Sequence, residues 1–347
     1  MCELFGLCSN KNVSISFSWR GFVRRGTIHR SGWGVGWYVE SEGGKRCVAL
    51  VKEPRPSVYS PVAVLLRRGI KSNIIISHVR RASKGDPKYV NTHPFVRSLG
   101  KDEWVFAHNG SLPGIEDLEL EKFHPVGDTD SEYAFCYILD NLQSSMKLKD
   151  LFKTLFELIQ KLADYGTFNF LMSNGRYLFA HTNNGKLHYL LRHPPHTGIV
   201  RVFGDDDYSV SLENVKSANE YAALIATVPL TNENWIKMEE EKLYVFRDGD
   251  LVLIIGSDGF KPVLSSKEIE TLKFIRLAPS SLRLCEIADS IGEDIESTYR
   301  IISSLVHRHY LKQHSHDRVA PNHPEARYFT RKNKRALIDI LIQTSHQ

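Results

Sequence analysis

A cysteine follows the first residue of the sequence, which begins MCELFGLCSN. Removal of Met1 would leave the Cys2 thiol beside its own α-amine. A thiol needs a base to become a nucleophile, and a neutral α-amine, with an unperturbed pKa of about 7.7–8.0, suits that role near pH 7. Taken alone, a cysteine at this position is more often an ordinary small residue, so the prediction of a nucleophile depends on other parts of the chain.

Two further segments carry side chains that suit the binding of a substrate. SHVRRAS (77–83) ends an apolar run with two arginines, and Arg80 offers a planar guanidinium fork for a carboxylate. The ordinary alternative is a pair of surface arginines. THPF (92–95) follows, and its His93 is either part of a binding pocket or a structural loop histidine.

A third pair of segments suits the stabilisation of charge. AHNGSL (107–112) places Asn109 and Gly110 at the end of an apolar run, where an amide side chain and a backbone N–H can form an oxyanion hole; a plain hairpin turn is the alternative. GDTDSE (127–132) puts Asp128 and Asp130 around a helix start. Capping explains part of their presence, and the functional interpretation is the binding of a substrate ammonium.

The order of these motifs resembles that of the class II glutamine amidotransferases, which are N-terminal nucleophile hydrolases. The shared order is an N-terminal cysteine, R-x-x-[ST] after a strand, H-P, H-N-G and T-D-[ST]-E. The nearer resemblance is to compact stand-alone members that begin MCEL and carry NTHPF, AHNG and GxTDSE, and it covers roughly residues 1–258. Larger members often have Trp-x-Thr-His after the arginine, whereas this chain has RASK (81–84), which leaves the pocket wall in doubt.

The resemblance implies an α+β fold, a four-layer αββα sandwich, and a reaction that needs no cofactor. Cys2 would attack the side-chain amide of glutamine or of a γ-glutamyl compound, and water would cleave the resulting γ-glutamyl thioester. Asn109 and Gly110 would hold the tetrahedral oxyanion. The implied substrate contacts are Arg80 for the α-carboxylate, Asp130 for the α-ammonium, and Ser83 and His93 for the pocket wall.

The sequence contains no segment that would use the released ammonia. It has no G-x-x-x-x-G-K-[ST] motif, no G-x-G-x-x-G that opens a helix, and no remaining stretch long enough for a synthase. Either a separate partner chain accepts ammonia, or the enzyme hydrolyses γ-glutamyl amides without an acceptor. Compact relatives are known as γ-glutamyl hydrolases, so the resemblance slightly favours hydrolysis.

Composition sets further bounds. The 347 residues are 42% hydrophobic and 24% charged, with a net charge of +5, which is ordinary for a globular protein of one or two domains. The five cysteines are scattered and form no CxxC pair, so we expect neither a disulfide framework nor a metal site. No apolar run reaches the ~18 residues of a membrane helix, and the first residues do not form a secretory signal. We therefore expect a cytoplasmic protein without a membrane partner.

Strands and two helices must position the candidate residues. Helices are predicted over 129–142, with Thr129 and Glu132 as a capping box, and over 148–166. NG at 174–175 predicts a type I′ hairpin turn, and DG at 248–249 predicts a second turn. The predicted strands cover 46–54, 73–79, 104–110, 168–182 as a hairpin, 223–230 and 243–255. We expect these elements to form one domain over residues 1–260.

The composition changes after residue 259 and predicts a second domain over residues 265–347. Helices over 265–279, 281–292 and 293–315, then a strand-like start and a last helix over 326–342, follow the order of a winged helix-turn-helix. In that interpretation Thr298, Arg300 and Arg331 are candidate DNA contacts; dimerisation or partner docking is the alternative. A second functional hypothesis follows, in which the amidotransferase domain senses a γ-glutamyl ligand and controls a DNA-binding winged helix.

Overall fold

The computed structural model describes residues 2–81, 86–204, 208–314 and 319–344. The chain divides into two compact units, Met1–Leu251 and Val252–Gln347, and each is considered by itself. Within the described ranges, no helix has the length and apolar character needed to cross a bilayer. Within the same ranges, no group of three or more His, Cys, Asp or Glu side chains is arranged to hold a metal ion.

Two large sheets lie wholly or mainly in the first unit. In the first sheet the strand order is β13-β9-β12-β1-β4-β2-β3, so β1 lies in its interior with antiparallel partners on both sides. The pairing of β1 with β4 sets Glu3 opposite Val79, which brings the chain start beside the end of β4. The strands are β1 (Glu3–Ser14), β2 (Gly32–Glu40), β3 (Arg46–Glu53), β4 (Lys71–Arg80), β9 (His188–Arg192), β12 (Ala222–Ala226) and β13 (Ile236–Lys237).

The second sheet has the order β16-β15-β14-β8-β7-β6-β5, and the division between the two units falls inside β15. β6 pairs with β7 so that Asn109 faces Asn169 and Gly110 faces Phe168. The strands are β5 (Phe95–Leu99), β6 (Asp102–Ser111), β7 (Thr167–Ser173), β8 (Leu178–Thr182), β14 (Lys242–Arg247), β15 (Asp250–Gly256) and β16 (Gly259–Pro262).

The two sheets of the first unit stack face to face. A Cβ atom at Gly6 would lie 2.9 Å from a side-chain carbon of Leu171, so glycine on β1 lets the sheets approach closely. At another point of the contact, the Tyr38 hydroxyl donates to the carbonyl oxygens of Glu103 and Ser173, both at 2.8 Å. These contacts fasten the sheet that carries Cys2 to the sheet that carries Asn109.

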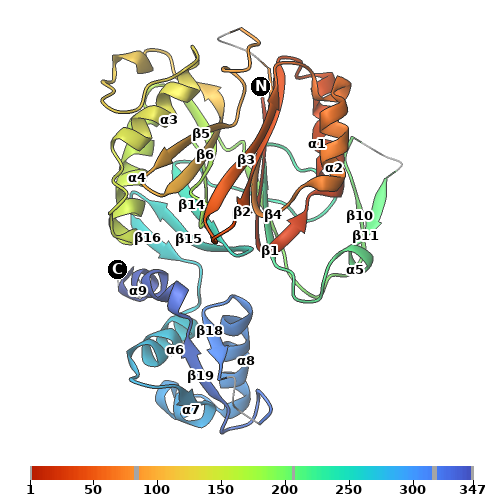
Figure 1. Ribbon diagram of the computed structural model, residues 1–347. Coiled ribbons are helices and arrows are strands. Elements are labelled where there is room, and N and C mark those ends of the chain that lie inside the picture. Colours follow the sequence, from red (N-terminus) through yellow and green to blue (C-terminus); the bar gives the residue numbers. More distant parts are fainter. Residues whose placement is uncertain (1, 82–85, 205–207, 315–318, 345–347) are drawn as a thin grey trace. The chain divides into compact units, whose positions relative to one another are not determined.

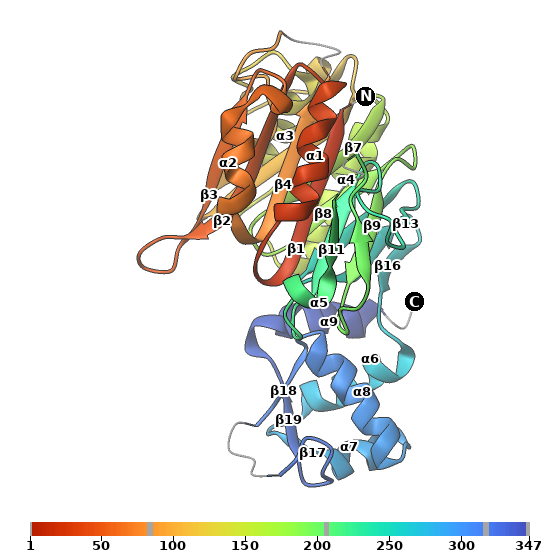
Figure 2. The same cartoon turned by 90° about the vertical axis from the view of Figure 1, so that its right-hand side faces the viewer.

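Helices cover the outer faces of both sheets, and Figures 1 and 2 show the resulting order of helix, sheet, sheet and helix. α3 (Asp130–Asp140) and α4 (Leu148–Ala163) lie on the second sheet and confirm the two predicted helices. α1 (Ser16–Arg24) and α2 (Pro61–Gly69) lie on the first sheet and were not predicted. Trp19 and Phe22 of α1 join the buried core of that sheet, where the Trp19 indole donates to Ala63 O at 2.8 Å.

Smaller elements complete the first unit. The strands β10 (Ile199–Arg201) and β11 (Ser209–Ser211) pair with each other, and the short helix α5 (Leu212–Val215) follows. The 3-10 helices within the described ranges are η1 (Arg25–Thr27), η2 (Ser57–Tyr59), η3 (Ile115–Asp117) and η4 (Lys332–Lys334), the last of which belongs to the second unit.

The two predicted turns differ in the structure. Between β14 and β15, Asp248 and Gly249 both have positive φ, 51° and 87°, as a type I′ turn requires. Between β7 and β8 only Gly175 has a positive φ, 79°, whereas the Asn174 side chain accepts from the N–H groups of Arg176 and Tyr177 at 3.1 Å. The type I′ prediction for this hairpin is therefore wrong, because the asparagine side chain organises a longer loop.

The second unit combines helices with a three-stranded sheet of order β17-β19-β18. The predicted helix over 293–315 is too long: α8 ends at His307, and His309 takes a positive φ of 60° before β18 begins. Buried side chains of α7, α8 and α9, among them Ile287, Leu305 and Leu341, form the interior. The elements are α6 (Ser266–Leu277), β17 (Leu282–Arg283), α7 (Leu284–Ile291), α8 (Ile295–His307), β18 (Leu311–Gln313), β19 (Arg327–Thr330) and α9 (Arg335–Thr344).

Candidate active site

Cys2 lies immediately before β1, beside the end of β4. Its Sγ accepts from Arg81 N at 3.2 Å and lies 3.3 Å from Arg81 O, to which the thiol donates. Burial raises the pKa of the Cys2 thiol, whereas the Arg81 N–H and the positive charge of Arg80 act to lower it. The half-buried thiol is thus held by the backbone of the neighbouring strand, with a cation close by.

Asn109 meets Cys2 from the second sheet. The Asn109 side chain is 2% exposed, and its Nδ2 donates to the Cys2 carbonyl oxygen at 2.6 Å. Its backbone carbonyl accepts from Asn169 Nδ2 at 2.8 Å, and the Thr182 hydroxyl donates to Asn169 Oδ1 at 2.5 Å. A chain of buried polar groups therefore fixes the strand position from which the Asn109 amide reaches Cys2.

Gly110 has no room for a side chain. A Cβ atom there would lie 1.8 Å from Thr167 O and 2.5 Å from His108 Nε2. These distances are far below van der Waals contact, so β6 and β7 require glycine at this position. The predicted reason for glycine was close approach of the backbone to an oxyanion; the atoms that leave no room for a side chain are those of Thr167 and His108.

Arg80 is the last residue of β4 and is 3% exposed. Its Nη1 donates to the backbone carbonyl of Asp86 at 3.1 Å. Burial lowers the pKa of the guanidinium, while negative charge at Cys2, Asp128 and Asp130 favours its charged form. A buried cation therefore lies within electrostatic range of both the thiol and two carboxylates.

Asp130 is the first residue of α3, after Thr129. Its Oδ2 accepts from Leu112 N and its Oδ1 from Ser131 N, both at 2.8 Å, so the carboxylate orders the strand end that follows Asn109. Thr129 Oγ1 accepts from Glu132 N at 3.3 Å. A capping box also needs the Glu132 carboxylate to accept from the backbone N–H of Thr129. Instead, this carboxylate accepts from Gly127 N at 2.8 Å and from Arg97.

Three buried histidines lie on or next to the strands that carry these residues: His78 on β4, His93 before β5 and His108 on β6. The rings of His78 and His93 are 4.3 Å apart between centroids, and burial lowers the pKa of both well below the usual histidine range. His108 Nδ1 is 2.8 Å from Ser131 Oγ and its Nε2 is 3.0 Å from Thr167 O. His93 was predicted to line the pocket; its ring packs against His78, on the strand of Arg80, and, with 4.5 Å between ring centroids, against Phe95.

Asn91 joins the two loops that frame the site, and it was not predicted as a functional residue. Its Nδ2 donates to Asp86 O at 3.1 Å, and its Oδ1 accepts from Asp128 N at 3.0 Å. Asp86 O is also the acceptor for Arg80, so one carbonyl links the arginine to this bridge. The signal in the sequence was the asparagine of the NTHPF motif, which is fully buried in the structure. Ser83, predicted for the pocket wall, lies outside the described residues.

Most of the chain matches a known protein family. Residues 1–270 match the class-II glutamine amidotransferases. The chain belongs to this family. Among similar amidotransferases, the putative glutamine amidotransferase YafJ of Escherichia coli is 38% identical over 263 residues, which cover 73% of this chain and 100% of that protein. A putative glutamine amidotransferase of Haemophilus influenzae is 37% identical, over 74% of this chain and 88% of that protein.

Two further matches extend the comparison. This amidotransferase is 40% identical to the uncharacterized protein MJ1515 of Methanocaldococcus jannaschii, over 98% of this chain and 96% of that protein, so both units have counterparts there. A solved structure, a predicted glutamine amidotransferase from Pseudomonas aeruginosa, superposes with a TM-score of 0.54 at 29% identity. The match covers 72% of this chain and 99% of that one.

One of the three predicted DNA contacts of the second unit is buried in the structure. Thr298 is fully buried, so its side chain does not face a partner and this prediction is wrong. Arg331 Nε donates to Leu311 O at 3.2 Å and ties β18 to the end of β19. Arg300 is exposed and forms an ion pair with Glu296 one helical turn away. None of the relatives named above is described as a transcriptional regulator.

Proposed function

We propose that this amidotransferase is an N-terminal nucleophile amidohydrolase that cleaves glutamine or another γ-glutamyl amide through Cys2. The contact that carries the proposal is the 2.6 Å hydrogen bond from Asn109 Nδ2 to the carbonyl of Cys2, because it sets an amide donor beside the candidate nucleophile. Removal of Met1 would free the α-amine of Cys2. With Met1 attached, that nitrogen is a peptide amide and is not a base.

The reaction would proceed in two halves. The α-amine, through a water molecule, takes the thiol proton, and the thiolate adds to the amide carbon of the substrate to form a tetrahedral oxyanion. The carbon–nitrogen bond then breaks, the leaving nitrogen takes the proton, and a γ-glutamyl thioester remains on Cys2. Water adds to the thioester and releases glutamate with the free thiol. Each passage through an oxyanion would be stabilised by the Gly110 N–H and by the second amide hydrogen of Asn109.

The charges around Arg80 support a zwitterionic substrate. We propose that the Arg80 guanidinium binds the α-carboxylate and that Asp130 accepts from the α-ammonium. A carboxylate has about four lone-pair sites, so Asp130 keeps acceptor capacity beyond its bonds to Leu112 and Ser131. Ser83 and His93 would form the pocket wall. The buried Arg80 is opposite in charge to an α-carboxylate, and the nearby Asp128 and Asp130 are opposite in charge to an α-ammonium.

Hydrolysis is the form of the reaction that we propose, with an ammonia-accepting partner chain as the competing form. We also propose that the catalytic domain occupies residues 1–260 of a cytoplasmic protein and that residues 265–347 form a winged helix-turn-helix. The succession of α6, β17, α7, α8, β18 and β19 supports that module. Because Thr298 is buried, the role that we propose for this module is interaction with a ligand or a protein rather than with DNA.

Glutamate release tests the proposal directly. The full chain, with its N-terminal residue established by sequencing, is assayed with glutamine, glutathione and other γ-glutamyl amides. Cys2→Ala should abolish release, whereas Cys8→Ala, which removes a buried thiol further along β1, should leave it close to the wild-type rate. Release of glutamate from none of these substrates, with Cys2 N-terminal, would contradict hydrolysis by the chain alone.

A further inference from the structure

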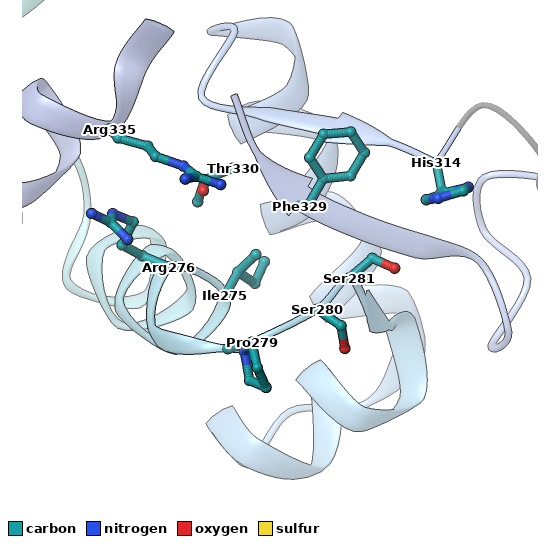
Figure 3. A pocket seen from close by; sticks show the side chains of 10 residues that line it. Ile275, Arg276, Pro279, Ser280, Ser281, His314, Phe329, Thr330 and Arg335 are labelled. Atoms are coloured by element: carbon teal, nitrogen blue, oxygen red, sulfur yellow. The ribbon is translucent and has the colours of Figure 1, made fainter. Parts of the chain in front are cut away.

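The second unit contains a pocket that the proposed chemistry does not use. It lies among the end of α6, the segment 278–281, the residue after β18, the strand β19 and the first residue of α9, and Figure 3 shows the side chains that line it. Its volume is about 540 Å³, within the range of small-molecule sites and larger than a bare inorganic anion needs. The pocket therefore has room for an organic ligand.

One part of the pocket is cationic. Arg276 and Arg335 come from different helices, and in Figure 3 both guanidinium groups lie at the same end of the pocket as Thr330. Arg276 forms an ion pair with Asp339: its Nε lies 2.9 Å from Oδ1, and its Nη2 donates to Oδ2 at 3.1 Å. Arg335 has no side-chain hydrogen bond or ion pair with any residue that the structure describes. After Asp339 balances Arg276, the charge of Arg335 remains for a ligand.

Another part of the pocket is apolar. Ile275, Pro279 and Phe329 contribute its walls, and the Phe329 ring is half-buried rather than enclosed in the core. The His314 ring contacts it edge-on, with 6.1 Å between centroids. An aromatic ring held in this way offers a surface on which a second flat group can stack. The hydroxyl of Thr330 adds a polar group between the cationic and the apolar parts.

We propose that this pocket binds a small molecule that combines an oxyanion group, phosphate or carboxylate, with a flat ring. The guanidinium of Arg335 binds the oxyanion in the two-pronged geometry that arginine forms with both groups. The ring lies against Phe329 and Ile275. A phosphate and a carboxylate would both accept from the guanidinium in this way. The flat ring would fill the part of the pocket volume that the anion leaves empty.

Calorimetric titration of the full chain tests the proposal with four probes: AMP, adenosine, benzoate and inorganic phosphate. AMP or benzoate should bind with one molecule per chain, and which of them binds tells whether the site takes a phosphate or a carboxylate. Arg335→Gln should weaken that binding by about tenfold or more, because a charge-assisted hydrogen bond is lost. Arg335 is exposed at the start of α9, so this change should leave the fold intact.

Two more variants complete the test. Ser280→Phe fills the pocket without changing its charge and should abolish binding, since Ser280 lines the site and is exposed. Arg300→Gln removes an exposed arginine of α8 outside the pocket lining and should leave binding unchanged. The proposal is overturned if neither AMP nor benzoate binds at millimolar concentration, if Arg335→Gln and Ser280→Phe bind the tighter of these two probes as the wild type does, or if inorganic phosphate or adenosine binds as tightly as that probe.

Discussion

The replacement of Asn109 by alanine tests the oxyanion donor with little disturbance elsewhere. The strand position of residue 109 is held through its backbone carbonyl, which accepts from Asn169, and alanine keeps that bond. What the change removes is the side-chain amide that donates to the Cys2 carbonyl at 2.6 Å. The variant should therefore fold, with Cys2 still beside β4 and with one donor fewer at the reacting carbon.

Two magnitudes follow from that geometry. Loss of one oxyanion donor lowers kcat by about a hundred- to a thousandfold, which corresponds to about 3–4 kcal/mol of activation free energy. The Cys2 carbonyl also loses its partner, which costs about 1–3 kcal/mol of unfolding free energy. KM for glutamine should change far less, because the residues proposed to hold the amino-acid charges are Arg80 and Asp130.

Steady-state glutamate release and urea denaturation of Asn109→Ala measure both quantities. Asn10→Ala is the matched control: its Nδ2 donates to the Asn219 carbonyl at 3.0 Å, far along β1 from Cys2. This control should lose stability and keep kcat. A fall in kcat of less than about fivefold for Asn109→Ala, or an equal fall in both variants, would refute the role of Asn109 as an oxyanion donor.

Two further predictions concern the residues around this centre. Arg80→Lys keeps the charge but loses the fork, so KM for glutamine should rise by about tenfold or more with a smaller change in kcat; an unchanged KM would contradict the carboxylate role. Lys52 donates to Thr92 O at 2.8 Å, and burial lowers its pKa from 10.5 to about 8. Between these pH values the unfolded chain binds more protons at this group, so its contribution to stability rises with pH. The stability of the wild type relative to Lys52→Met, from urea midpoints, should therefore increase from pH 7.5 to 10, and a constant difference would argue against the buried charge.

The sequence predicts the fold best where periodicity is long. α4 places Phe152, Leu155, Ile159 and Leu162 on one buried face, and this spacing alone indicates a helix. α1 and α2 were missed because SFSWRGFVR and PVAVLLRRG are short and contain aromatic or β-branched residues, which suit strands as well. Their helical form depends on packing against the first sheet, which a local pattern does not contain.

The site divides in a similar way. Cys2, Arg80, Asn109 and Asp130 could be named as candidates because each has a chemically distinctive side chain in an ordered motif, and the structure brings the Asn109 amide to the Cys2 carbonyl. The contact between the tilted rings of His78 and His93 could not, because it joins β4 to the loop before β5 through tertiary structure alone. In the second unit, the winged helix-turn-helix interpretation made Thr298 a candidate DNA contact, but helix packing buries it. Residue type indicates candidate chemistry, whereas burial and partners are decided by the assembled sheets and helices.

The most direct test of the central claim is intact mass spectrometry after incubation with 6-diazo-5-oxo-norleucine, a glutamine analogue that alkylates nucleophilic thiols. The account predicts a chain that lacks Met1 and carries one adduct, mapped to Cys2 by peptide sequencing and absent from Cys2→Ala. An adduct that persists in Cys2→Ala, or a chain that retains Met1 while it releases glutamate, would contradict the claim that Cys2 is the N-terminal nucleophile.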